Sequence, residues 1–463
     1  MRKTKLHIVG LTALTTFLSA ACGPTQTDGA YSLYPPDFTS GSSHAIFTDI
    51  TSETVNLTMD IAAQTANVHA TMRINIEQPD GGSPVIDLVP TQATTVTVDN
   101  GQPVILETVK SPDGLTTFRM VGGAALSAGP HTLAFSYALT PGGEVDNTPA
   151  QGLTWGTGTF DFTTNQDDLL DRGFTERYFP AGVEAQRYPM TINVDVENAA
   201  LGQANVVTGG TITTNADGHS YTITYPDYDA TSSWFFEVLD TTRYKFGSGT
   251  YTSVDGRSIP IATTALTQSD ADLMVSDAQG FLAELEGDYG PFPHDHLQVA
   301  YTDQNDPEEY DSCVQTDFNS QKTTPVARGA LGHEILHQWF GRSARPHGGR
   351  DGWVDEAIAE WRDDGYPRAK SVDLMSMYKV LAYDSKYERT TPDASYDQGS
   401  SMLSMLDFLF ANSGGMKPVL KAFQAQFKGQ LYTTEDFLSF VKQQHPDQAA
   451  QLDTIFTKMV YGK

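Results

Sequence analysis

The chain has 463 residues, which is long enough for two or three domains with several buried cores. Its 57 acidic residues outnumber its 29 Lys and Arg residues, and the net charge is −28. Nucleic-acid binding requires clustered cations that contact phosphates, so we expect no nucleic-acid partner. The acidic balance is typical of a soluble extracellular surface.

The N-terminus has the pattern of a secretory signal peptide over residues 1–21. Basic residues precede an apolar run from Ile8 to Leu18, which is too short to cross a membrane. The sequence LSAAC, which ends at Cys22, is similar to a bacterial lipobox with its leucine one position early. We predict lipidation of Cys22, a tether over residues 22–30 and attachment to the bacterial cell envelope, in the periplasm, at the outer membrane or on the cell surface. Cleavage without lipidation is the alternative.

Residues 31–243 show the alternation of apolar and polar residues that is typical of half-buried antiparallel strands. Asn100-Gly101 and Asp217-Gly218 lie between such runs. Both pairs favour tight hairpin turns, because their residues adopt positive φ readily. We therefore predict an N-terminal antiparallel β-sandwich domain with little helix.

Residues 244–463 show a mainly helical pattern after the first strand-like residues. Apolar residues recur at helical spacing between a predicted N-cap at Ser269 and the break Tyr289-Gly290-Pro291-Phe292-Pro293. An apolar strand is expected at Leu297–Tyr301, and the sequence TTED from Thr433 favours another helix start. The chain is thus predicted to be an α+β multidomain protein.

The motif HEILH begins at His333. Four residues apart on a helix, His333 and His337 lie on one face and can bind one Zn²⁺, while Glu334 faces a water at the metal. A single helix cannot surround a tetrahedral ion, so a third ligand must come from another element. We predict one zinc ion per chain, although other divalent ions can occupy such a set. An accidental or vestigial motif is the alternative.

Two sequences around these residues resemble the aminopeptidase N family, the membrane alanyl aminopeptidases, which are zinc metallopeptidases of the gluzincin type. The family reads like HELAHQWFG and then carries a Glu in a WLNEG context, where this chain has HEILHQWFG and WVDEA. The resemblance runs from about residue 50 to the end. It implies a thermolysin-like, mainly helical zinc catalytic domain over 244–463, in a short form without the family's C-terminal helical domain.

The resemblance also implies roles for individual residues. His333, His337 and Glu356 would hold zinc, and Glu334 would be the general base. The sequence YDQG at Tyr396 is similar to the family's Y-E-K-G element, in which the tyrosine hydroxyl stabilises the oxyanion. A Gln replaces the usual Lys of that element here.

Three further carboxylates are candidates for the site. The family's G-x-M-E-N loop is absent, but Glu309 in the sequence DPEEY could match a related M-E-Y form and bind the substrate's α-amine. Pairing with another cation, or exposure to water, is the alternative. Glu360 and Asp355 are candidate hydrogen-bond partners of a zinc-ligating histidine, and a solvated position is the alternative for both.

We expect zinc-dependent hydrolysis of peptide bonds, most simply the release of N-terminal residues from peptides. The expected partners are peptide substrates and, through the lipid, a membrane. One alternative is an endopeptidase or oligopeptidase that uses the same zinc chemistry in an open cleft. The second is a catalytically silent lipoprotein that binds a partner.

Overall fold

The structure is a computed structural model. Contacts divide the chain into residues 1–32 and 33–463, and all the described residues belong to the second unit. The predicted signal peptide, Cys22 and the tether lie outside the described residues. The structure describes residues 34–88, 93–114, 116–139, 144–145, 148–149, 153–156, 159–163, 176, 178–183, 186–225, 234–301, 307–317, 325–373, 379–380, 387, 391 and 393–463.

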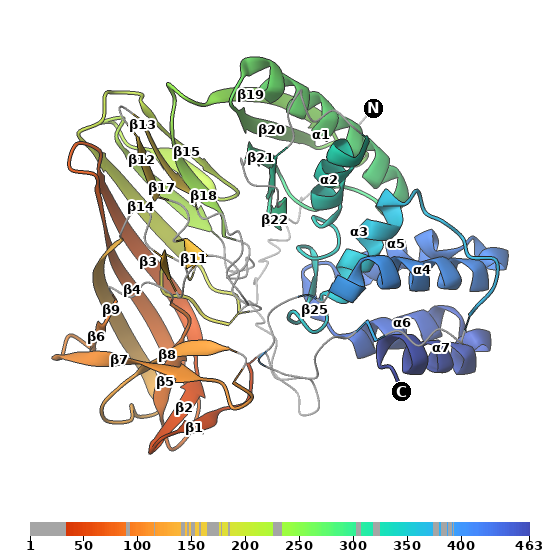
Figure 1. Ribbon diagram of the computed structural model, residues 1–463, viewed down its shortest axis with the longest axis horizontal. Helices are drawn as coiled ribbons and strands as arrows, with labels where there is room; N and C mark the ends of the chain where they lie inside the picture. Colours follow the sequence, from red (N-terminus) through yellow and green to blue (C-terminus); the bar gives the residue numbers. More distant parts are fainter. Residues whose placement is uncertain are drawn as a thin grey trace, which may run out of the picture. The chain divides into compact units, whose positions relative to one another are not determined.

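A twelve-stranded sheet dominates the first half of the chain, with the strand order β1-β2-β5-β8-β7-β6-β9-β4-β3-β14-β17-β16 (Figure 1). Its strands are β1 (Phe38–Ser40), β2 (Ser43–Phe47), β3 (Asp49–Asp60), β4 (Thr65–Ile76), β5 (Ser83–Ile86), β6 (Thr95–Val98), β7 (Pro103–Lys110), β8 (Thr117–Val121), β9 (Gly129–Leu139), β14 (Met190–Glu197), β16 (Thr211–Thr214) and β17 (Ser220–Tyr225). Side chains alternate between buried and exposed along β3 and β4, as the sequence pattern predicts.

A four-stranded sheet accompanies the large one, with the order β12-β13-β18-β15. Its strands are β12 (Leu153–Gly156), β13 (Thr159–Thr163), β15 (Ala204–Thr208) and β18 (Phe236–Asp240), and a separate two-stranded sheet joins β10 (Glu144–Val145) and β11 (Thr148–Pro149). One apolar cluster contains Val206 and Val238 from the four-stranded sheet together with Leu57 and Val68 from the large sheet. The two sheets therefore share a core.

Two of our local predictions for this half are confirmed and one is wrong. The pair Asn100-Gly101 connects the antiparallel strands β6 and β7, and Gly218, at φ 72°, lies in the turn between the antiparallel strands β16 and β17. The expectation of a wholly antiparallel arrangement is wrong, because β14 pairs parallel with β3 and β2 pairs parallel with β5. Long connections separate each of these pairs in the chain, and parallel neighbours require such crossovers.

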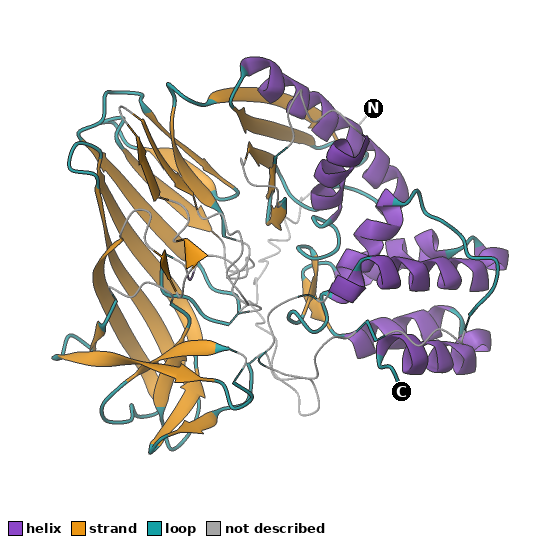
Figure 2. Cartoon of the chain, viewed as in Figure 1, coloured by secondary structure: helices purple, strands orange, loops and turns teal. Residues whose placement is uncertain are grey.

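The second half contains a five-stranded sheet in the order β19-β20-β21-β23-β22, a small sheet of β24 and β25, and seven α-helices among the described residues (Figure 2). The strands are β19 (Lys245–Thr252), β20 (Ser258–Ala265), β21 (Leu297–Tyr301), β22 (Glu308–Tyr310), β23 (Cys313–Thr316), β24 (Ala344–Pro346) and β25 (Gln430–Tyr432). The helices are α1 (Gln268–Tyr289), α2 (Pro325–Leu336), α3 (Trp353–Asp363), α4 (Asp397–Leu409), α5 (Met416–Phe427), α6 (Thr434–Gln444) and α7 (Ala449–Ile455). None of the helices within the described ranges is both long and apolar enough to cross a membrane.

Helix boundaries follow local hydrogen bonding. The expectation that Ser269 caps α1 is wrong, because Thr267 has extended backbone angles and its side chain accepts from the backbone N–H of Asp270. The helix ends at Tyr289, and the next residue, Gly290, is its C-cap, with a φ of 99° that favours glycine. Thr433 caps α6 in a reciprocal capping box with Asp436, which confirms the helix start predicted there.

Candidate functional site

The HEILH motif lies at the C-terminal end of α2. His333 and Glu334 belong to the helix, and His337 directly follows its last residue while still making a helical hydrogen bond from its N–H to the carbonyl of His333 at 3.3 Å. Leu331 and Ile335 are fully buried in the core of this half. Their burial anchors the helix, so the opposite face presents both imidazoles in one direction.

Glu356 reaches the two histidines from α3. Its Oε2 atom lies 3.2 Å from His333 Nε2 and 3.3 Å from His337 Nε2. The three predicted ligand atoms all lie within 4.8 Å of one another. Ala357 and Ile358, on the same helix, are fully buried, which fixes α3 against the core.

The ligand geometry fits a zinc ion. Ligand atoms at the usual bond lengths from a tetrahedral zinc lie about 3.3 Å from each other. The two nitrogen-to-oxygen distances, 3.2 and 3.3 Å, match this separation. His337 is 1 % exposed, so the donors converge in a largely dry environment that favours a bound cation.

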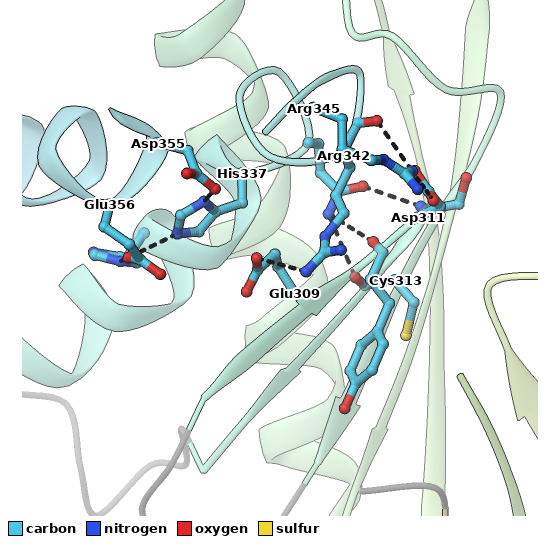
Figure 3. A network of polar contacts seen from close by, with 12 residues as sticks. Glu309, Asp311, Cys313, His337, Arg342, Arg345, Asp355 and Glu356 are labelled. Carbon is cyan, nitrogen blue, oxygen red and sulfur yellow. Dashed lines mark hydrogen bonds and ion pairs between the residues drawn. The ribbon is translucent and has the colours of Figure 1, made fainter. Parts of the chain in front are cut away.

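Carboxylates also contact the outer nitrogen of each imidazole. His337 Nδ1 lies 3.3 Å from Asp355 Oδ2, so these two side chains form an ion pair (Figure 3). His333 Nδ1 lies 2.8 Å from Asp363 Oδ2, so the hydrogen bond of this nitrogen is to Asp363 and not to the candidate Glu360. Such partners orient a ligating imidazole and hold its proton on the outer nitrogen.

Glu360 lies close to His333 and Asp363, with ligand atoms within 4.8 Å, but Asp363 makes the hydrogen bond. Glu360 is one helical turn beyond Glu356, whereas Asp363 is two turns beyond it, at the last residue of α3. The spacing of two turns from Glu356 puts Asp363 on the same face of α3, but it does not by itself identify the contact with His333.

The protonation of the site is set by its buried neighbours. Burial alone would lower the pKa of His333, but hydrogen bonds to Asp363 and Glu356 raise it to about 10. Burial would raise the pKa of Glu356, but the two imidazoles, His337 first, hold it well below its usual range. Without a metal ion the imidazoles therefore hold protons, which a metal must displace, because only the neutral ring is a ligand.

Glu334 is buried beside these groups. Its carboxylate lies within 4.8 Å of the ligand atoms of His337 and Glu309. Burial raises the pKa of Glu334 to about 8; the charge of Glu309 adds to this effect, whereas His333 opposes it. The carboxylate therefore has the basicity of a group that can accept and release a proton near neutral pH.

Tyr396 lies on the exposed side of the cluster. Its ring stacks on that of His333, with centroids 6.2 Å apart, and the residue is 36 % exposed. The negative charge of Glu356, and then burial, raises the pKa of Tyr396, so the hydroxyl keeps its proton. The structure thus brings Tyr396 to the predicted metal ligands.

Glu309 lies on β22, where it pairs with Val314 of β23. Its Oε1 accepts from Arg342 Nη2 at 2.6 Å (Figure 3). Pairing with another cation was the alternative for Glu309, and the structure shows such a pair with Arg342. Sequence reasoning missed Arg342, because nothing in its local pattern indicates a partner on a distant strand.

We expect Asp363→Ala to weaken zinc binding about ten- to a hundredfold, because His333 would lose the acceptor that orients its ring. Competition with a chelator of known affinity measures the change. Asp364→Ala is the matched control, since Asp364 is the next residue and instead accepts a hydrogen bond from Ser400. Equal zinc affinities in the two variants would contradict the assigned role of Asp363.

No protein-family model and no curated protein matches the chain. Solved structures are similar to it. The M1 zinc metallopeptidase from Deinococcus radiodurans matches with a TM-score of 0.62 and 16% identity, over 89% of this chain and 93% of that chain. A mutant of that protein matches with a TM-score of 0.62 and 17% identity, over 89% of this chain and 94% of that chain.

A two-domain M1 zinc metallopeptidase mutant bound to L-arginine matches with a TM-score of 0.59 and 15% identity, over 89% of this chain and 94% of that chain. At these identities, the likeness concerns the fold. The chain therefore shares its fold, over most of its length, with M1 zinc metallopeptidases.

Proposed function

We propose that the protein is a zinc-dependent peptidase of the aminopeptidase N type that releases N-terminal residues from peptides. The observation that carries the proposal is the convergence of His333, His337 and Glu356 at separations that suit tetrahedral zinc, with Glu334 buried beside them. The shared fold supports it, since one similar structure is described as bound to a Tyr-Ser-Ala substrate and another to L-arginine.

Each nearby side chain has a part in this chemistry. Zinc, when bound, supplies a Lewis acid that polarises the scissile carbonyl and acidifies water. Glu334 accepts the proton of the attacking water and returns it to the leaving amine. Tyr396 keeps its proton and so donates a hydrogen bond to the oxyanion as the carbonyl becomes tetrahedral.

Selection of the N-terminal residue is assigned to Glu309. Its carboxylate lies within 4.8 Å of the ligand atoms of Glu334 and His337, which is the region where the first residue of a peptide would lie if its carbonyl were at the metal. A carboxylate there attracts an ammonium group by simple electrostatics. An acetylated N-terminus carries no such charge.

The proposed domain organisation is a β-sandwich domain over residues 31–243 and a thermolysin-like catalytic domain over 244–463. The first region contains the two sheets that share a core, and the second contains the metal-ligand helices. The match over 94% of a protein described as a two-domain M1 zinc metallopeptidase supports this division. Limited proteolysis that yields no stable fragment near residue 243 would count against it.

Glu334→Gln should keep one zinc per chain and reduce turnover by about a hundredfold to ten-thousandfold, because the amide cannot accept the proton of the attacking water. Zinc is measured by atomic absorption and turnover by peptide cleavage. Glu284→Gln provides a control, since that carboxylate is 43 % exposed on α1 and pairs with Arg362. Near-normal turnover in the Glu334 variant would show that another group is the base.

Purified protein should cleave a peptide with a free N-terminus and leave its N-acetylated twin largely intact, and a zinc chelator should abolish the cleavage reversibly. The physical reason is the charge of the free α-amine beside Glu309. Equal cleavage of both peptides would indicate an endopeptidase or oligopeptidase. If neither peptide is cleaved with zinc present, the proposed function is wrong.

Export and lipid attachment at Cys22 are part of the proposal and rest on the sequence pattern alone. Cys22→Ala should abolish labelling with a radioactive fatty acid and move the protein from the membrane pellet to the supernatant. Cys313→Ala is the matched control, because Cys313 is the only other cysteine and is buried. Unchanged labelling of the Cys22 variant would contradict lipidation at this position.

A further inference from the structure

Arg342 connects the segment that carries the metal ligands to the strand that carries Glu309. It lies in the turn after α2, where its backbone N–H donates to the carbonyl of His337 at 2.9 Å. Its guanidinium points toward β22 and donates from Nη2 to Glu309 Oε1 at 2.6 Å (Figure 3). One residue therefore contacts both a metal ligand and the candidate amine-binding carboxylate.

The Arg342–Glu309 ion pair is buried. The Arg342 side chain is 8 % exposed and that of Glu309 is 13 % exposed. Removing two charges from water is costly, and only close, well-directed hydrogen bonds offset that cost. A buried pair of this kind permits few conformations of either side chain, so it restricts the position of the Glu309 carboxylate at the rim of the metal site.

The ion pair also counters a repulsion within the site. The Glu309 carboxylate lies within 4.8 Å of the ligand atoms of Glu334 and His337, so two carboxylates share a small buried volume. Whenever Glu334 is ionised, as it must be to act as a base, the two like charges repel and the more flexible group is pushed away. A guanidinium behind Glu309 reduces its net negative charge and holds the carboxylate close to Glu334.

Release of a single N-terminal residue requires an accurate distance between the amine-binding group and the metal. In a peptide only one carbon atom separates the α-amine from the carbonyl that is attacked, so an error of about 1 Å is costly. Pairing with Val314 fixes the backbone of Glu309 but leaves its side-chain torsions undetermined. The ion pair uses Oε1, so Oε2 can accept from an ammonium group.

We propose that Arg342 is a positioning residue that holds the Glu309 carboxylate at a set distance from the metal ligands and thereby determines recognition of the substrate's free α-amine. This inference rests on the proposed function. Arg342 itself does not contact the reacting atoms, so its influence passes through Glu309.

The test compares Arg342→Met, Arg342→Lys, Glu309→Gln and the double variant Glu309→Gln with Arg342→Met, each loaded with zinc. The free and N-acetylated peptides serve as substrates. Arg342→Met should lower kcat/KM for the free peptide about ten- to a hundredfold, mainly through KM, and leave the acetylated peptide nearly unaffected. Arg342→Lys should recover part of the loss, and the double variant should be no worse than Glu309→Gln alone.

Arg345 provides the matched control. It lies in the same segment and is similarly buried, but its Nη2 donates to Asp311 Oδ2 at 2.5 Å and to the backbone carbonyl of Arg342 at 3.2 Å, not to Glu309. Arg345→Met should keep the wild-type preference for the free peptide. Zinc content and circular dichroism show whether each variant is folded. If Arg342→Met does not fold, the test uses Arg342→Lys instead. An unchanged preference for the free peptide in Arg342→Lys then overturns the inference.

The possible failures are distinguishable. Wild-type protein that cuts neither peptide with zinc present overturns the proposed function and this inference with it. Wild-type protein that prefers the free peptide, while both Arg342 variants keep that preference, overturns this inference alone. The inference is also overturned if the effects of Glu309→Gln and Arg342→Met multiply, since Arg342 would then act independently of Glu309.

Discussion

One carboxylate oxygen sets the geometry of the candidate site. Glu356 Oε2 lies within hydrogen-bonding distance of the Nε2 atoms of both His333 and His337, and so fixes α3 against the end of α2. Both helices contribute apolar side chains to a single core around this polar junction. A buried charge that loses its partners is very costly, so small displacements of either helix are resisted. The remaining groups of the site are arranged around this contact.

Different surroundings give two carboxylates in the same cluster opposite shifts of pKa. Glu356 contacts both imidazoles, which lower its pKa despite burial, whereas burial dominates at Glu334 and raises its pKa to about 8. A metal ligand must remain ionised, while a general base must take up and release a proton. Both residues are glutamates, so the difference between their pKa values comes from their surroundings. The two glutamates alone would therefore not provide this chemistry, because it also requires the core that buries Glu334.

Helical periodicity explains why the two histidines could be predicted from their spacing, and the family resemblance led to Glu356 and Tyr396, which the structure places at the same cluster. The contacts of Asp363 and Arg342 could not be predicted in the same way. They depend on how α3 crosses α2 and on which strand lies beside the turn after α2, and neither follows from local periodicity. The parallel pairing of β14 with β3 was missed for a similar reason, since the alternation of side chains does not distinguish parallel from antiparallel neighbours.

All three candidate ligands, and the carboxylate partners of both imidazoles, lie on α2, on α3 or at the residue that follows α2. A bound ion would thus also cross-link two helices of the core. A ligand that binds only the folded state stabilises it by about 2.7 kcal/mol when its free concentration is a hundred times its dissociation constant. Metal supply would then govern the lifetime of the protein as well as its activity, a dependence that faster proteolysis of the metal-free form would reveal.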